Sequence, residues 1–148
     1  MYFVDREKIE NTLNHIEVLL SRYRNQSTWD SVIEKLALER IGHNLIESII
    51  DVGNAMIDGF IMRDPGSYED IIDILEDEKV VEASVAEQLR HVIRFRKPLV
   101  QAYVTVDHSQ LLNILEGNVA AIEAFPGAVR HYLESELGPV SAFLPKEN

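Results

Sequence analysis

The amino-acid sequence predicts an all-α protein, an up-and-down bundle of four main helices plus a short helix. Apolar residues recur at spacings of three and four along most of the 148 residues, which is the period of amphipathic helices. Helix-capping residues precede several of these stretches, and no long segment alternates between apolar and polar residues as a strand does. Since no linker or repeat interrupts the pattern, we expect one domain over residues 1–138 and a C-terminal tail over residues 139–148.

The first two helices carry the clearest patterns. Asp5 is expected to cap the first helix, which ends near Asn25. Its buried stripe is expected to comprise Ile9, Leu13, Ile16 and Leu20. The second helix is expected from about Trp29 to Ile61, with apolar residues along its whole length. Its length and its wide apolar face predict that it is the longest helix and lies at the centre of the bundle.

Turn and capping residues place the next two helices. A proline and a glycine at positions 65 and 66 predict a turn after the second helix. Ser67 with Asp70, and Ser84 with Glu87, have the spacing of capping boxes. We therefore expect a short third helix over residues 68–75 and a fourth over residues 85–95.

The last helix is expected to begin after Asp107, which is a favourable N-cap residue. Apolar residues at helical spacing follow it as far as position 122. A proline at position 126, between Phe125 and Gly127, predicts an interruption, because proline lacks the N–H that a helix interior requires. Helix is expected to resume over residues 128–133.

Composition limits the functional classes. The formal net charge is −11, so non-specific adsorption to nucleic acid is disfavoured and any contact with RNA has to be local. The absence of cysteine excludes disulfides and thiolate zinc sites. The first twenty residues mix charged and apolar residues, unlike a signal peptide or a membrane span. We therefore expect a cytoplasmic protein that does not contact a membrane.

A cationic cluster interrupts this acidic background. Arg90, Arg94, Arg96 and Lys97 are four of only 14 lysine and arginine residues, and they lie within eight positions. On one continuous helix, Arg90, Arg94 and Lys97 would share a face. That face would be able to bind a phosphate, a carboxylate or an acidic partner surface. The alternative is that they pair with acids of this protein. Pro98 predicts a kink or break of the fourth helix at this cluster.

The cluster belongs to a longer motif. Arg96, Leu99, Val100 and Tyr103 stand where the HepT-like branch of the HEPN superfamily has Arg-Asn-x-Leu-Val-His-x-Tyr, and the chain resembles that branch. The resemblance covers roughly residues 30–135. Upstream it includes Glu39-Arg40, residues 46–51 and Pro65-x-Ser67-Tyr68. It implies an HEPN-like helical bundle.

The resemblance also implies a chemistry. HepT-like proteins include ribonuclease toxins encoded beside a minimal nucleotidyltransferase antitoxin, and they cleave RNA without metal through attack of the ribose 2′-hydroxyl on the adjacent phosphate. In that reaction Arg96 stabilises the phosphorane, and no metal or cofactor is expected. The family's histidine is Gln101 in this chain, and its asparagine is Lys97. An amide does not transfer protons near neutral pH, so weak activity or none is expected.

Other polar residues are assigned supporting roles. Arg40, His43, Glu47, Asp51, Asn54 and Asp58 form a polar stripe on the second predicted helix. Glu47 and Asp51 either face Arg96 and orient it, or belong to a solvent face or an ion-pair network. The stripe lacks a second ligand-bearing helix, so a metal site is not expected. His91 and His108 bracket the cationic cluster and are the alternatives to Gln101 for proton transfer.

Three functional readings follow. In the first, the chain is a homodimeric HepT-like toxin, weakly active or restrained by a nucleotidyltransferase partner that adenylylates Tyr103, as the resemblance implies. In the second, it is a non-catalytic module that binds nucleotide, RNA or a partner protein through Arg94, Arg96 and Lys97. In the third, it is a structural or interaction protein whose cations pair with its own acids.

Overall fold

The computed structural model describes residues 2–138, which are almost entirely helical. In chain order the elements are α1 (Arg6–Asn25), α2 (Val32–Gly59), α3 (Tyr68–Asp77), α4 (Ala83–Arg94), α5 (Arg96–Gln101), the 3₁₀ helix η1 (Tyr103–Thr105) and α6 (His108–Leu137). The described part of the chain contains no strand. The predicted all-α class is confirmed.

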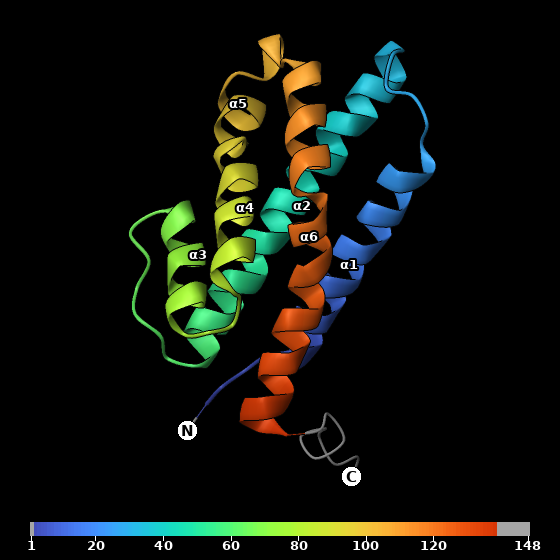
Figure 1. The fold of residues 1–148 in the computed structure, drawn as a ribbon. Helices are drawn as coiled ribbons and strands as arrows, with labels where there is room; N and C mark the ends of the chain where they lie inside the picture. Colours follow the sequence, from blue (N-terminus) through green and yellow to red (C-terminus); the bar gives the residue numbers. More distant parts are fainter. Residues whose placement is uncertain (1, 139–148) are drawn as a thin grey trace.

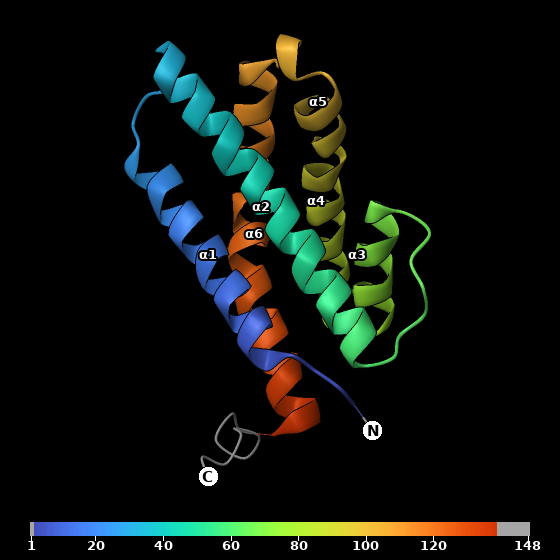
Figure 2. The same cartoon turned by 180° about the vertical axis from the view of Figure 1, so that it is seen from behind.

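Four long elements form the bundle. α1, α2 and α6 run side by side, and α4 completes the bundle on the other side of α6 (Figure 1). α3 lies on the outer flank against α4 and the C-terminal half of α2, as the rear view also shows (Figure 2). α5 continues beyond the end of α4 and packs on α2. This arrangement confirms the predicted up-and-down bundle, with α5 and η1 as additional short helices.

α2 is the central helix because it is apolar over a wide face. Leu45, Ile46, Ile49 and Met56 are completely buried in the core shared with the other helices. The helix begins three residues later than predicted, at Val32, because a capping box at Ser31 and Glu34 starts it. Backbone and hydroxyl groups around this cap donate hydrogen bonds to the Glu34 carboxylate, and the largest effect comes from Ser31. They lower the pKa of this carboxyl to about 2.

The predicted interruption at Pro126 is wrong. α6 runs through this proline and has 30 residues against 28 in α2, so α2 is not the longest helix. A proline inside a helix costs about 3 kcal/mol or more. Phe125 is 0% exposed, and Pro126, Val129 and Leu133 are buried beyond it. Burying each large apolar side chain contributes about 1.5–3 kcal/mol, so core packing outweighs the cost of the proline.

The predicted caps are confirmed at three of four helices. The side chains of Asp5, Ser67 and Asp107 accept hydrogen bonds from backbone N–H groups of Lys8, Asp70 and Gln110. The cap predicted at Ser84 is wrong, because α4 begins at Ala83 and its N-cap residue, Glu82, makes no side-chain capping bond. Val80 and Val81 are buried in the core, and their burial places the turn just before α4 begins at Ala83.

The extent of the domain stays a prediction. All six α-helices contribute side chains to one buried cluster, as a single domain over residues 1–138 requires. The predicted tail, residues 139–148, lies outside the described residues. Within residues 2–138, every helix is too short or too polar to cross a membrane.

We expect Gly53→Ala to destabilise the bundle. A Cβ atom on Gly53 of α2 would lie 2.3 Å from Cγ2 of Ile71 in α3, and Ile71 is buried, so the two helices would have to move apart. Overpacking of this kind costs about 1–3 kcal/mol, measured as a loss in the free energy of urea-induced unfolding.

Gly117→Ala in α6 is the matched control, because a Cβ atom there would meet no atom within 4 Å. Alanine favours helix over glycine by about 0.5–1 kcal/mol, so this variant should be as stable as the natural chain or more stable. Equal stability of the two variants would contradict the close approach of α2 and α3.

Candidate functional site

The backbone breaks at the cationic cluster, as predicted. Pro98 has no N–H, so the carbonyl of Arg94 lacks the donor that would continue α4. Phe95 ends α4, and α5 begins at Arg96. Pro98 then lies in the first turn of α5, where a missing N–H carries no penalty, and the helix continues with a bond from Leu99 N–H to the Phe95 carbonyl.

Arg96 is held from two sides. Its Nε donates a hydrogen bond of 2.5 Å to Oε1 of Glu47 on α2, and its guanidinium carbon lies 4.4 Å from the ring centroid of Tyr68 at the start of α3. The side chain is 23% exposed. Its two terminal amino groups make no hydrogen bond within residues 2–138. The guanidinium is therefore oriented, and its terminal amino groups keep donors that the described part of the chain does not use.

Arg90 and Arg94 are occupied by acids of α3. Arg90 donates to Asp73 at 2.9 Å and Glu76 at 3.1 Å, and Arg94 donates to Glu69 at 2.8 Å. These pairs agree with the alternative that the cations neutralise this protein's own acids. Lys97 lies in α5 and the two arginines lie in α4, so the predicted face does not belong to one continuous helix.

The remaining polar positions of the motif lie on the surface. Lys97 and Gln101 are exposed on α5, and Tyr103 is 69% exposed on η1. None of the three makes a hydrogen bond or ion pair through its side chain within the described part of the chain. Asp51 is also exposed and does not reach Arg96. The structure thus brings one predicted carboxylate, that of Glu47, to Arg96.

His43 is the residue near Arg96 that the motif does not include. Its Nε2 lies 3.6 Å from Oε1 of Glu47, the same oxygen that Arg96 binds. The sequence places His43 one turn before Glu47 on the polar stripe, which is the signal that identifies it. Residues 2–138 hold no group of three histidine or carboxylate side chains placed for a metal ion.

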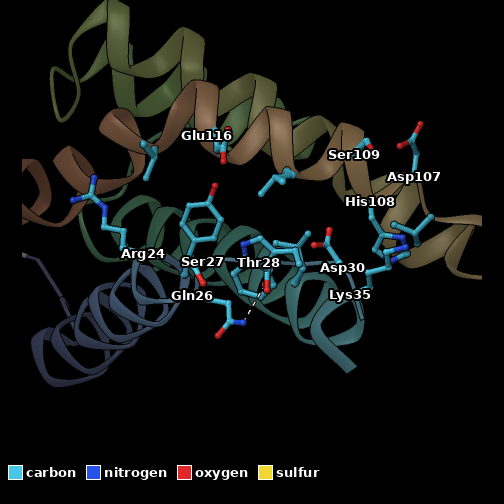
Figure 3. Close-up of a pocket in the computed structure, with 16 residues that line it drawn as sticks. Arg24, Gln26, Ser27, Thr28, Asp30, Lys35, Asp107, His108, Ser109 and Glu116 are labelled. Atoms are coloured by element: carbon cyan, nitrogen blue, oxygen red, sulfur yellow. Dashed lines mark hydrogen bonds between the residues drawn. The ribbon is translucent and has the colours of Figure 1, made fainter. Parts of the chain in front are cut away.

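A separate pocket of about 730 Å³ lies where the end of α1, the start of α2 and the start of α6 meet (Figure 3). Tyr23 and Trp29 stack along it with ring centroids 5.9 Å apart, and burial raises the pKa of Tyr23 to about 12. Lys35 and His108 lie together toward one end of this pocket. His108 is bound to Glu39 at 2.8 Å. The motif residues do not line it, and sequence analysis did not identify it.

The chain is similar to ribonuclease-related proteins. A family model described as Ribonuclease HepT-like matches residues 9–129. The Bacillus subtilis protein described as "Putative RNase YutE" is 55% identical over 143 residues, covering 97% of this chain and 99% of the relative. A solved structure of YutE, described as a cytosolic protein, superposes with a TM-score of 0.94 over 97% of this chain and 100% of that chain, at 55% identity.

More distant structures share the fold. The tri-AMPylated Shewanella oneidensis HEPN toxin, solved in complex with MNT antitoxin, is 16% identical. It superposes with a TM-score of 0.73 over 83% of this chain and 96% of that chain. The match of the family model to most of the chain, together with the 55% identity to YutE, shows that this protein belongs to the Ribonuclease HepT-like family.

Proposed function

We propose that this chain is a HepT-like toxin that acts on RNA, with weak cleavage activity or none, and that Arg96 binds the reacting phosphate. The observation that carries the proposal is the geometry of Arg96. Glu47 binds its Nε and Tyr68 covers one face, while the two terminal amino groups are open. A guanidinium in this state presents parallel N–H donors that match two phosphate oxygens.

The low activity follows from position 101. The reaction forms a bond from the ribose 2′-oxygen to phosphorus and breaks the bond to the 5′-oxygen, so protons leave one oxygen and reach the other. Arg96 stabilises the negative charge that develops on the non-bridging oxygens of the phosphorane, and the Gln101 amide transfers no proton. Where no other side chain transfers these protons, the absence of general acid–base help costs about 10²–10⁴ in rate.

We expect Arg96→Ala to reduce single-turnover cleavage of a labelled single-stranded RNA, without divalent metal, by about 100-fold or more. Gln101→His should raise the rate above that of the natural chain, because it restores an imidazole at the motif position, and Lys97→Asn should be tested with it. Arg22→Ala is the control, since Arg22 is an exposed arginine of α1 far from the motif in sequence. Cleavage that survives Arg96→Ala would remove the assignment of this site.

A non-catalytic module is the second candidate, and the glutamine at position 101 favours it. Lys97 is exposed beside Arg96 and adds a second cation for a polyanion. If every variant fails to cleave, yet RNA or a nucleotide binds the natural chain and not Arg96→Ala, this reading is the better one.

Tyr103 is proposed as the site at which a nucleotidyltransferase antitoxin adds adenylate. Its exposure of 69% on η1 leaves the ring open to a partner enzyme. The Shewanella toxin with a similar fold is AMPylated and bound to MNT antitoxin. With ATP and a minimal nucleotidyltransferase encoded beside this chain, mass spectrometry should find adenylate on the natural chain and none on Tyr103→Phe. Equal modification of both would contradict the assignment.

We also propose a homodimer with Arg96 near the two-fold axis. Apolar side chains at the start of α2 and on η1 are open to solvent, including Ile33 at 75% and Val104 at 84% exposed, and both elements lie at the same end of the bundle (Figures 1 and 2). Burying such side chains in a second copy would offset their exposure. Sedimentation should show a dimer at about tens of micromolar, above the range of low-micromolar affinity. A monomer there would contradict the proposal.

A further inference from the structure

His43 shares a carboxylate oxygen with Arg96. Oε1 of Glu47 accepts the 2.5 Å bond from Arg96 Nε and lies 3.6 Å from His43 Nε2. The His43 side chain is 34% exposed, so a substrate can reach it. One carboxylate oxygen therefore lies between the His43 imidazole and the guanidinium proposed to bind phosphate.

The other histidines are placed differently. His108 is bound to Glu39, which precedes Glu47 by eight residues and so lies about 12 Å away along α2. His91 is exposed on α4 and has no side-chain partner within residues 2–138. His15 binds Asn44. Of the histidines in the described part of the chain, His43 alone shares a partner with Arg96.

We infer that His43 is the proton-transfer residue of this site, doing the work for which the family motif uses the position now held by Gln101. The inference rests on the proposed function. Imidazole takes up and releases protons near neutral pH, whereas an amide does not. One turn of α2 separates His43 from Glu47, so the helix fixes the imidazole relative to Arg96.

One imidazole is sufficient for both proton transfers of the cleavage reaction. His43 accepts the proton of the 2′-hydroxyl as its oxygen forms the bond to phosphorus, and Arg96 binds two non-bridging oxygens of the phosphorane. The bond from phosphorus to the 5′-oxygen then breaks, and His43 gives the same proton to that oxygen. The products are a 2′,3′-cyclic phosphate and a 5′-hydroxyl, and the protein is returned to its starting state.

The test is single-turnover cleavage of a labelled single-stranded RNA without divalent metal, with RNA affinity measured in parallel. His43→Ala should slow cleavage by about 100-fold or to background, with RNA affinity changed less than about twofold. Added imidazole should restore part of the rate to His43→Ala. His131→Ala is the matched control, because His131 is an exposed histidine of α6 and should leave both readouts unchanged.

The double variant separates chemistry from structure. In the Gln101→His background, His43→Ala should cost much less, because the introduced imidazole transfers the proton. An equal cost in both backgrounds without rescue by imidazole would mean that His43 only supports the fold, and would overturn the inference.

The two proposals fail in different ways. If Arg96→Ala abolishes cleavage and His43→Ala does not change it, the inference is overturned and the proposed function stands. The same holds if the natural chain binds RNA through Arg96 without cleaving it. If Arg96→Ala changes neither cleavage nor binding, both the inference and the proposed function fail.

Discussion

A break in the backbone at Phe95 arranges the whole candidate site. Pro98 cannot donate to the carbonyl of Arg94, so one helix ends and another begins at Arg96. The cations before the break turn to acids of α3, and the cation after it turns to Glu47 on α2. The break thus lies between Arg90 and Arg94, which pair with acids of α3, and Arg96, whose terminal amino groups make no hydrogen bond within residues 2–138.

Glu47 acts through orientation more than through stability. A partly exposed ion pair contributes about 0–1 kcal/mol, which is small against the burial of α2. Glu47 matters for the geometry of the site, since one of its carboxylate oxygens binds the Nε edge of Arg96 and lies beside His43. Removal of Glu47 would therefore free the Nε edge of Arg96 and remove the carboxylate beside His43, while leaving the core intact. This is the arrangement expected where phosphate binding and proton transfer meet at one point.

The charge of the chain constrains the proposed binding of RNA. With a net charge of −11, the molecule as a whole repels a polyanion, and acids of α3 already occupy Arg90 and Arg94. Arg96, through its terminal amino groups, and the exposed Lys97 are the cations of this segment that remain for the proposed ligand. A homodimer with a two-fold axis near Arg96 would double this small set and bring two open guanidinium edges to one ligand, which would also offset their mutual repulsion.

Helix periodicity and caps such as Asp5 and Asp107 were readable in the sequence because they depend on neighbours within one or two turns. The HepT-like motif was readable for the same reason, and with it Arg96. Contacts across the bundle were not. The choice of Glu47 over Asp51 as partner depends on how α5 packs on α2, and the continuation of α6 through Pro126 depends on the core that covers it. Local rules name the helices and the reactive groups, whereas packing between residues far apart in the chain decides which groups meet and where a proline is tolerated.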